Sequence, residues 1–323
     1  MNNSYTAVGI VNYPSAQLTA VHGVTDMLLT ANRFIQELGK QGTPLFCVSH
    51  WILSGDKQTL QPQFCSQESA PPQQDILLVP GSLNSDYDCK QDPTLLKWIR
   101  SQHEKGAIAC SVCKGAFILA QSGLLINRTV TTHWALEEEF TTQFPDVHVQ
   151  IDKILIDGGD VITAGGVMAW LDLGLRLIHR FAGSEVMLAV AKFLLIDPNG
   201  REQKFYSAFS PQLNHGDEIV VKTQRWLQTH YAEALSLDKL AEVAATSVRT
   251  LIRRFHSALN MTPTSYIQQL RIGKARELLE LTNLPVSKIA WDVGYQDTGA
   301  FRKVFQSLLS ITPGEYRRRF AVE

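Results

Sequence analysis

The pattern of apolar residues changes once along this chain, near residue 197, and this change limits the folds that the chain can adopt. Up to about residue 195, short β-rich apolar runs alternate with stretches of helical spacing, which predicts an α/β domain with a mostly parallel sheet. From residue 217 onward only helical spacing remains, which predicts an all-α domain. Since 323 residues exceed one ordinary core, we expect two domains.

Short apolar runs mark the strands expected in the first part. The strand candidates are Ala7–Val11, Leu45–Ile52, Asp75–Val79, Ala107–Val112, Thr129–Thr132 and Val161–Thr163. Helices are expected between them, for example over Thr94–His103 and Ala135–Phe144, with a long helical stretch from about Met168 to Leu195. We therefore expect a first domain over residues 1–196.

Residues 197–216 read DPNGREQKFYSAFSPQLNHG and have no apolar periodicity. Two prolines and two glycines in this stretch are typical of a connecting segment. The stretch is therefore predicted to be a linker to a second domain over residues 217–323.

The second domain is predicted to contain two helix-turn-helix units joined by one helix. Leu237–Ala244 and Val248–Leu259 form the first unit, and the connecting helix starts at Thr262, which caps it, and runs to Leu281. Gly294 suits a tight turn, and Asp297 can cap the last helix of the second unit.

The net charge of -1 hides an asymmetry between the two domains. Residues 1–216 hold 15 Lys and Arg against 20 Asp and Glu, whereas residues 217–323 hold 15 against 11. The basic C-terminal part weakly favours a polyanionic partner.

Two sets of polar residues point outward if the apolar residues of their helices face inward. Arg249 and Arg253 lie four apart in the first unit, and Thr298 and Arg302, with Lys303 beside them, are their counterparts in the second. Arg and Lys can reach guanine acceptors in the major groove. A solvated face of a helical bundle is the alternative for any single helix, but the repeated architecture favours DNA binding.

The C-terminal part closely resembles the AraC/XylS family of bacterial transcription regulators over about 100 residues. The matching segments are Leu237–Ala244, SVRTLIRRFHSALNMTPTSYIQQLRIGKARELL and IAWDVGYQDTGAFRKVFQSLLSITPGEYRRRF. The resemblance places Arg249, Ile252 and Arg253 in the base-facing part of the first recognition helix, and Thr298, Gly299, Arg302 and Lys303 in that of the second. Gly299 departs from the usual Ser or His. The resemblance implies a double-stranded DNA operator and, for an activator, RNA polymerase as partners.

The first part resembles the class I glutamine amidotransferase-like superfamily, on its PfpI-like branch, over roughly residues 5–195. The motifs are DILLVPGS, SVCKGAFILAQSGLL, TTHWAL and DGGDVITAGGVMAWLDLGL. This resemblance implies a flavodoxin-like sandwich with a mostly parallel sheet. Regulators that join such a domain to an AraC-type DNA-binding domain are a known arrangement.

The PfpI-like resemblance places Cys113 at a nucleophile elbow, where the start of the following helix favours a thiolate. It places His133 near the cysteine and Asp26 where an acidic side chain approaches the sulfur, so the three are candidates for nucleophile, base and carboxylate partner. Lys114 stands where a catalytic histidine is common, which argues against catalysis.

We therefore expect a pocket that binds a small-molecule effector or senses redox state, with Asp26, Cys113, Lys114 and His133 as its residues. Structural or dimerising roles for these residues are the plainer alternative. A cysteine-dependent hydrolase or hydratase with an appended DNA-binding module is the rival function.

The five cysteines, an odd number without dense spacing, favour a reducing compartment. Cys110 and Cys113 form a C-x-x-C pair, but Cys110 is expected within a strand and no second ligand pair accompanies it, so no metal is expected. No export or membrane signal is visible at the N-terminus. We expect a cytoplasmic homodimer without a cofactor.

Overall fold

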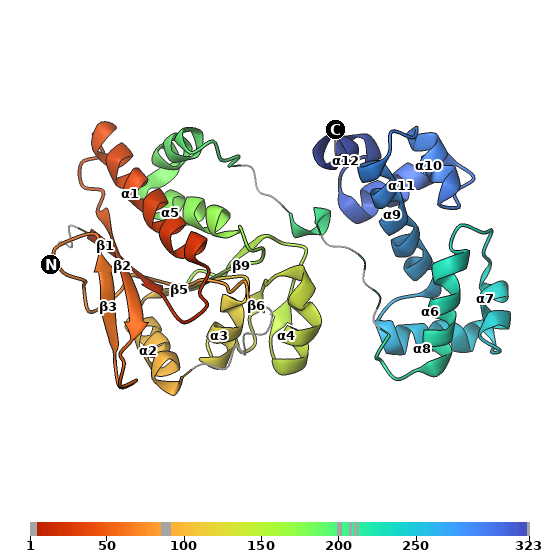
Figure 1. Cartoon of the computed structure of the whole chain (residues 1–323), viewed down its shortest axis with the longest axis horizontal. Helices are drawn as coiled ribbons and strands as arrows, with labels where there is room; N and C mark the ends of the chain where they lie inside the picture. Colours follow the sequence, from red (N-terminus) through yellow and green to blue (C-terminus); the bar gives the residue numbers. More distant parts are fainter. Residues whose placement is uncertain are drawn as a thin grey trace. The chain divides into compact units, whose positions relative to one another are not determined.

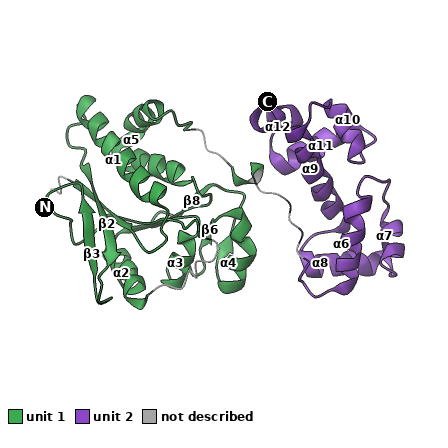
Figure 2. Ribbon diagram, viewed as in Figure 1, with its two compact units in different colours: residues 1–207 green, residues 208–323 purple. Residues whose placement is uncertain are grey.

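The computed structural model describes residues 5–84, 92–198, 202–206, 209, 211 and 213–321. The chain forms two compact units, residues 1–207 and residues 208–323 (Figure 2). The first is an α/β unit and the second is helical, as predicted from the change of apolar pattern.

The α/β unit is built on a sheet in which seven described strands lie in the order β3-β2-β1-β4-β5-β9-β8 (Figure 1). They are β1 (Tyr5–Val11), β2 (Leu45–Leu53), β3 (Leu60–Cys65), β4 (Ile76–Val79), β5 (Ile108–Val112), β8 (Leu155–Asp157) and β9 (Val161–Ala164). The five central strands run parallel, and the edge strands β3 and β8 are antiparallel to their neighbours. The prediction of a mostly parallel sheet is thus confirmed.

Helices cover both faces of this sheet. On one face α1 (Leu18–Glu37) packs against α5 (Trp170–Phe193), and on the other lie α2 (Pro93–Glu104) and α3 (Gly115–Gln121) (Figure 1). Because neither face meets water, every residue of β4 and β5 is buried. This is why these strands appear in the sequence as continuous apolar runs.

The strands that the sequence analysis missed lie at edges. β3 has mostly exposed residues and contains Pro62, and β8 is only three residues long. An edge strand is paired on one side only, so it needs neither a continuous apolar run nor a donor at every residue. The strand expected over Thr129–Thr132 shortens to β6 (Thr129–Val130), which pairs with β7 (His148–Val149) outside the main sheet.

Two of the expected helices are interrupted. The helix expected over Ala135–Phe144 begins as a 3-10 turn, η1 (Trp134–Leu136), and continues as α4 (Glu137–Gln143). The long helix α5 breaks at Gly183, whose φ of 84° lies in the left-handed region that favours glycine.

The helical unit contains the two predicted helix-turn-helix units. Its helices are α6 (Glu218–His230), α7 (Leu237–Val243), α8 (Val248–Leu259), α9 (Pro263–Leu281), α10 (Val286–Asp292), α11 (Thr298–Leu309) and α12 (Pro313–Phe320). Thr262 and Asp297 cap α9 and α11 through their side chains, as expected. Gly294 has a φ of 91°, so the tight turn predicted there is also confirmed.

Two separate apolar cores hold this unit together, and α9 takes part in both. To the core with α6, α7 and α8 it contributes Tyr266, Ile267 and Leu270, and to the core with α10, α11 and α12 it contributes Ile272, Ala275 and Leu279. One continuous helix therefore fixes the spacing of the two helix-turn-helix units.

Part of the stretch predicted as a linker packs on the α/β unit. The 3-10 turn η2 (Gln203–Phe205) buries Gln203, whose side-chain amide donates to the carbonyl oxygens of Thr132 at 2.9 Å and Lys153 at 3.0 Å. The Gln203 side chain also accepts a hydrogen bond from the backbone nitrogen of Trp134. The linker over residues 197–216 stays a prediction.

A fragment of residues 208–323 should fold on its own, because both of its cores are built from its own residues. A fragment that starts at residue 217 should be less stable by about 1–2 kcal/mol, since it lacks the edge-to-face contact of Phe209 with Tyr266 and the His215–Gln224 hydrogen bond. Urea unfolding followed by circular dichroism measures both. Failure of the longer fragment to fold would refute the modular organisation.

Candidate functional site

The helix α8, which is predicted to be the first recognition helix, exposes two arginines. Leu251 and Phe255 are buried, whereas Arg249 and Arg253 are exposed. Neither arginine makes a hydrogen bond or an ion pair with any residue that the structure describes. Both guanidinium groups are therefore available to a ligand outside the protein.

Four other arginines of the helical unit are held by the protein itself. Arg254 pairs with Asp217, Arg271 donates to the carbonyl oxygens of Tyr231 and Glu233, Arg276 donates to the Tyr316 hydroxyl, and Arg317 donates to the carbonyl oxygen of Leu284. These arginines connect elements of the fold. These hydrogen bonds and the ion pair thus distinguish arginines that stabilise the fold from arginines that could contact a ligand.

The neighbouring residues Arg253 and Arg254 show this separation most sharply. Arg254 Nη1 lies 2.9 Å from Asp217 Oδ2, and Asp217 also caps α6 by accepting from the backbone nitrogens of Ile219 and Val220. Partial burial alone would raise the pKa of Asp217, but the hydrogen bonds from Val220 and Arg254 leave that pKa below its ordinary value. Arg254 therefore ties α8 to the start of α6.

The second recognition helix, α11, exposes Arg302 and Lys303, and Thr298 is half-buried at its first position. Asp297 accepts from the backbone nitrogens of Gly299 and Ala300, and these hydrogen bonds, with the charge of Lys303, lower the pKa of its carboxyl group. A carboxylate thus stands at the start of this helix, where a DNA phosphate would be repelled. α8 has the uncharged Ser247 at the same place.

In the α/β unit, Cys113 occupies the sharp turn between β5 and α3. Its φ of 53° lies in the left-handed region, which is uncommon for a residue other than glycine. Its backbone nitrogen donates to the carbonyl oxygen of Ala164 at 2.7 Å, and its carbonyl oxygen accepts from Thr132 Oγ1 at 3.0 Å. The turn is therefore fixed from both sides.

Two glycines allow the chain to pack closely around this turn. A Cβ atom on Gly115 would lie 2.2 Å from the carbonyl oxygen of Val79, and one on Gly81 would lie 2.9 Å from Cys113 Cβ. α3 can therefore approach the carboxyl end of β4 only with glycine at position 115. The Cys113 side chain is 4% exposed in this packing.

His133 has a structural contact of its own. It precedes the η1 turn, and its Nδ1 atom accepts a hydrogen bond from the backbone nitrogen of Ala135 at 3.1 Å. Burial lowers the pKa of His133, which favours the neutral imidazole with its proton on Nε2. The described structure contains no hydrogen bond between His133 and Cys113.

Asp26 lies on the exposed side of α1 and makes no hydrogen bond or ion pair with a described residue. The start of α1 approaches the Cys113 turn, because the backbone nitrogen of Gln17 donates to the carbonyl oxygen of Gly81. Asp26 is about 12 Å further along the helix at the usual rise per residue. The residue that contacts the loop beside the turn is therefore the buried Gln17, which precedes α1 and which the sequence analysis did not identify.

Lys114 is buried beside Cys113, and its Nζ atom donates to the carbonyl oxygen of Asn84 at 3.2 Å. The backbone nitrogen of Asn84 in turn donates to Ser82 Oγ. Lys114 thus holds the loop that follows β4 against the turn.

Cys89 lies outside the described residues.

A groove of about 760 Å³ lies at the carboxyl ends of β1 and β2, and the sequence analysis did not predict it. Tyr13, Trp51 and Leu95 are among its apolar lining residues, and Lys57 and Asp92 are among its charged ones. β1 is the strand from which the chain order runs outward in both directions, and α/β proteins bind ligands beyond such a switch point. None of the four predicted pocket residues lines the groove.

A hydrogen bond from Tyr13 connects the groove to the loop beside the cysteine turn. The hydroxyl group of Tyr13 donates to the carbonyl oxygen of Pro80 at 2.9 Å, directly before Gly81. A ligand that moves Tyr13 would therefore act on the loop that contacts Cys113.

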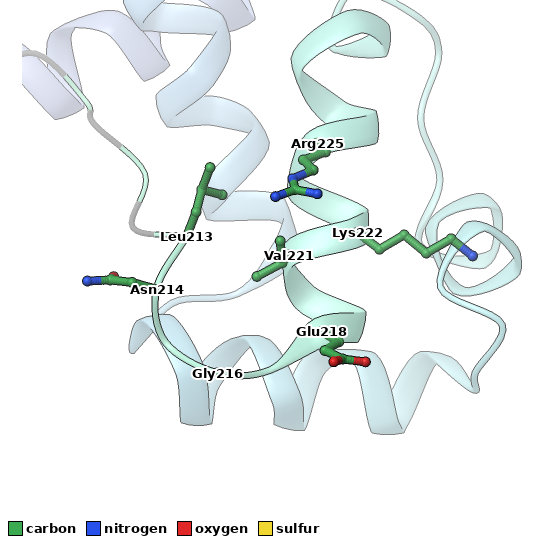
Figure 3. Close-up of a pocket in the computed structure, with 7 residues that line it drawn as sticks. All are labelled: Leu213, Asn214, Gly216, Glu218, Val221, Lys222 and Arg225. Atoms are coloured by element: carbon green, nitrogen blue, oxygen red, sulfur yellow. The ribbon is translucent and has the colours of Figure 1, made fainter.

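A second hollow, of about 620 Å³, lies within the helical unit between residues 213–216 and α6 (Figure 3). Figure 3 shows Arg225 reaching toward Leu213, while Lys222 points away from it. No predicted DNA-binding residue lines this hollow.

Among the described residues, no group of three or more His, Cys, Asp and Glu side chains is placed to hold a metal ion. Cys110 is buried within β5, and this burial raises the pKa of its thiol.

None of the helices described is both long and apolar enough to cross a membrane.

Two protein families match separate parts of the chain. The DJ-1/PfpI family matches residues 26–180, and a helix-turn-helix domain of AraC type matches residues 240–319. The first match covers the strands and helices around Cys113, and the second covers both recognition helices.

Curated relatives match over different lengths of the chain. The HTH-type transcriptional regulator CdhR of Pseudomonas aeruginosa is 28% identical over 228 residues, which are 70% of this chain and 67% of that protein. The HTH-type transcriptional regulator GlxA of Rhizobium meliloti is 29% identical over 64% of each chain. The HTH-type transcriptional activator RhaS of Escherichia fergusonii is 37% identical over 93 residues, which are 29% of this chain and 34% of that protein.

His133→Ala should lower the free energy of unfolding by about 1 kcal/mol, because the backbone nitrogen of Ala135 loses its acceptor. His133→Asn should restore most of this loss, since asparagine is a good helix cap. Urea unfolding measures the stability of both variants. The rate at which iodoacetamide alkylates Cys113, followed by mass spectrometry, should be the same in both variants as in the wild type. Alkylation that is slower than in the wild type by the same factor in both variants would instead support His133 as the base.

Proposed function

We propose that this chain, in which a DJ-1/PfpI-family domain precedes an AraC-type helix-turn-helix domain, is a sequence-specific DNA-binding transcriptional regulator. The observation that carries the proposal is the presence on α8 and α11 of exposed arginines that have no partner among the described residues, in a unit whose other arginines include four held by the fold. Guanidinium groups of this kind suit guanine edges and phosphates in double-stranded DNA.

Both recognition helices should enter the major groove on one face of the duplex. The connecting helix α9 has 19 residues and is therefore about 28 Å long. This length suits two groove segments about one helical turn, or 10 bp, apart. We assign base reading to Arg253, and we expect fewer base contacts from the α11 residues. The Asp297 carboxylate repels DNA phosphates, and Gly299 has no side chain with which to contact a base.

We infer that the α/β domain controls DNA binding and does not catalyse a reaction. A small-molecule effector would shift the regulator between two states only if it binds them with different affinity. The groove at the ends of β1 and β2 is our candidate effector site, and its hydrogen bond from Tyr13 to Pro80 links it to the Cys113 turn. Asp26 does not line this groove, so we do not include it in the proposed effector site.

Three features argue against turnover at Cys113. Cys113 is almost fully buried, the Nδ1 lone pair of His133 is used by a backbone nitrogen, and Asp26 is exposed on a more distant turn of α1. Neither His133 nor Asp26 is therefore placed as the base that a cysteine hydrolase needs. The rival function is therefore the weaker proposal.

The partners that follow from this function are a double-stranded DNA operator, a small-molecule effector, a second copy of the chain and, for an activator, RNA polymerase. A homodimer would let two DNA-binding units bind one operator and raise the affinity through linkage. We infer that the protein works in the cytoplasm, where bacterial DNA is found.

Arg253→Ala should weaken operator binding by about 1–3 kcal/mol and relax the preference at one base position, because a base-reading guanidinium is lost. Binding to a panel of single-base operator variants at fixed salt measures this effect. A uniform loss across the panel would instead indicate a phosphate contact. Lys303→Ala is expected to show a smaller effect of the same kind.

Arg254→Ala is the matched control at the next position. It should leave base preference unchanged and lower the stability of the helical unit by about 1 kcal/mol or less, because it removes a partly exposed ion pair with Asp217. If Arg254→Ala changed the base preference and Arg253→Ala did not, the assignment of the two arginines would be reversed.

Cys113→Ala should leave effector-free DNA binding unchanged, because Cys113 lies in the other compact unit from the recognition helices. Gel-shift titration of the wild type and the variant tests this expectation. Assays of small amides, nitriles and aldehydes should show no turnover by either protein. Multiple turnovers by the wild type that Cys113→Ala abolishes would establish the hydrolase or hydratase function.

A further inference from the structure

Two thiols lie close together on neighbouring strands, away from the Cys113 turn. Cys47 is on β2 and Cys65 is the last residue of β3, and their sulfur atoms are 3.8 Å apart. The antiparallel register pairs Cys65 with Ser49, so Cys47 and Ser49 lie on one face of β2 and Cys65 on the same face of β3. The two side chains are therefore diagonal neighbours on one face of the sheet.

A disulfide between these residues needs only local movement. The sulfur atoms must approach by about 1.8 Å to reach the usual bond length. β3 is an edge strand with no described strand on its far side, so it can shift toward β2 without breaking a sheet interaction there. Directly after Cys65 the chain is anchored, because the backbone nitrogen of Ser66 donates to Val48 and the Ser66 hydroxyl accepts from Val48.

The two thiols differ in environment. Cys47 is 1% exposed, and burial together with the neighbouring Cys65 raises the pKa of its thiol to about 12. Cys65 is partly exposed at the end of β3, and its sulfur accepts from the backbone nitrogen of Gln67 at 3.5 Å. Cys65 is therefore the thiol of the pair that a small oxidant can reach from solvent.

We propose that Cys47 and Cys65 are a peroxide-sensitive dithiol that closes to an intramolecular disulfide. The Cys65 thiolate attacks one oxygen of hydrogen peroxide, the O–O bond breaks, and Cys65 becomes a sulfenic acid while hydroxide leaves. The Cys47 sulfur then attacks the Cys65 sulfur, the S–O bond breaks, and water leaves with the Cys47 proton. Peroxide is reduced by two electrons and the two thiols are oxidised to one disulfide.

The disulfide would join two strands, β2 and the edge strand β3, that both line the groove. Trp51 and Leu53 of β2 and Gln63 of β3 all line the groove described above. Oxidation would therefore fix the two strands that form one side of it. This consequence for effector binding rests on the proposed function, whereas the disulfide itself does not.

The test treats the full-length reduced protein with hydrogen peroxide, blocks free thiols by alkylation, and maps the peptides by mass spectrometry. The wild type should lose two hydrogens and give a peptide pair that joins Cys47 to Cys65, and dithiothreitol should reverse the change. Cys89→Ala, Cys110→Ala and Cys113→Ala should form the same pair, because none of these cysteines takes part in the reaction.

Two variants separate the roles of the pair. Cys47→Ala should leave Cys65 as a sulfenic acid that dimedone traps, and Cys47→Ser serves if the alanine variant does not fold. Cys65→Ser, at a partly exposed position, should slow oxidation of Cys47 by about tenfold or more, because the sulfur atom that peroxide can reach from solvent is absent.

The proposal is overturned if the wild type forms no Cys47–Cys65 peptide pair, or if dimedone labels Cys65 no more in Cys47→Ala than in the wild type. Operator binding by reduced and oxidised protein is measured separately. Loss of all DNA binding in the reduced protein would refute the proposed function and leave the disulfide result standing.

Discussion

The geometry of the DNA-binding unit depends on the burial of apolar side chains along two segments of α9. Tyr266, Ile267 and Leu270 fill one core, and Ile272 and the residues after it fill the other. Because both cores close on the same helix, neither helix-turn-helix unit can turn without exposing part of its apolar surface. A covalently continuous helix of fixed rise then sets the distance between α8 and α11. The spacing of α8 and α11 is thus a consequence of core packing.

On this scaffold, function depends on which cations the fold leaves without partners. Arg253 and Arg254 are adjacent in sequence, yet Arg254 is held by Asp217 and Arg253 has no described partner. A guanidinium that already meets a carboxylate or carbonyl oxygen would have to break that contact before it could bind DNA. An arginine that has no partner among the described residues would bind DNA without this loss. The modest net basic charge of the unit therefore understates its capacity to bind a polyanion.

In the α/β unit the same close packing builds the Cys113 turn and limits its chemistry. Gly115 lets α3 meet β4, and the left-handed backbone at Cys113 is held by hydrogen bonds on both sides. The result is a nearly buried thiol beside a buried lysine, with His133 bonded to its own helix turn. A turn that is fixed beside a loop leading to the groove suits the regulatory role that we propose for this domain. The Tyr13 hydrogen bond to Pro80 provides that link to the groove.

The sequence by itself determined the two kinds of domain, the parallel strands and the recognition helices, because continuous apolar runs and helical spacing are local patterns. It also located the caps at Thr262 and Asp297 and the turn at Gly294. The edge strands, the groove and the closeness of Cys47 to Cys65 were decided only by the tertiary structure. Strand register and side-chain contacts between distant segments depend on how the sheet assembles, and single residue types do not record them.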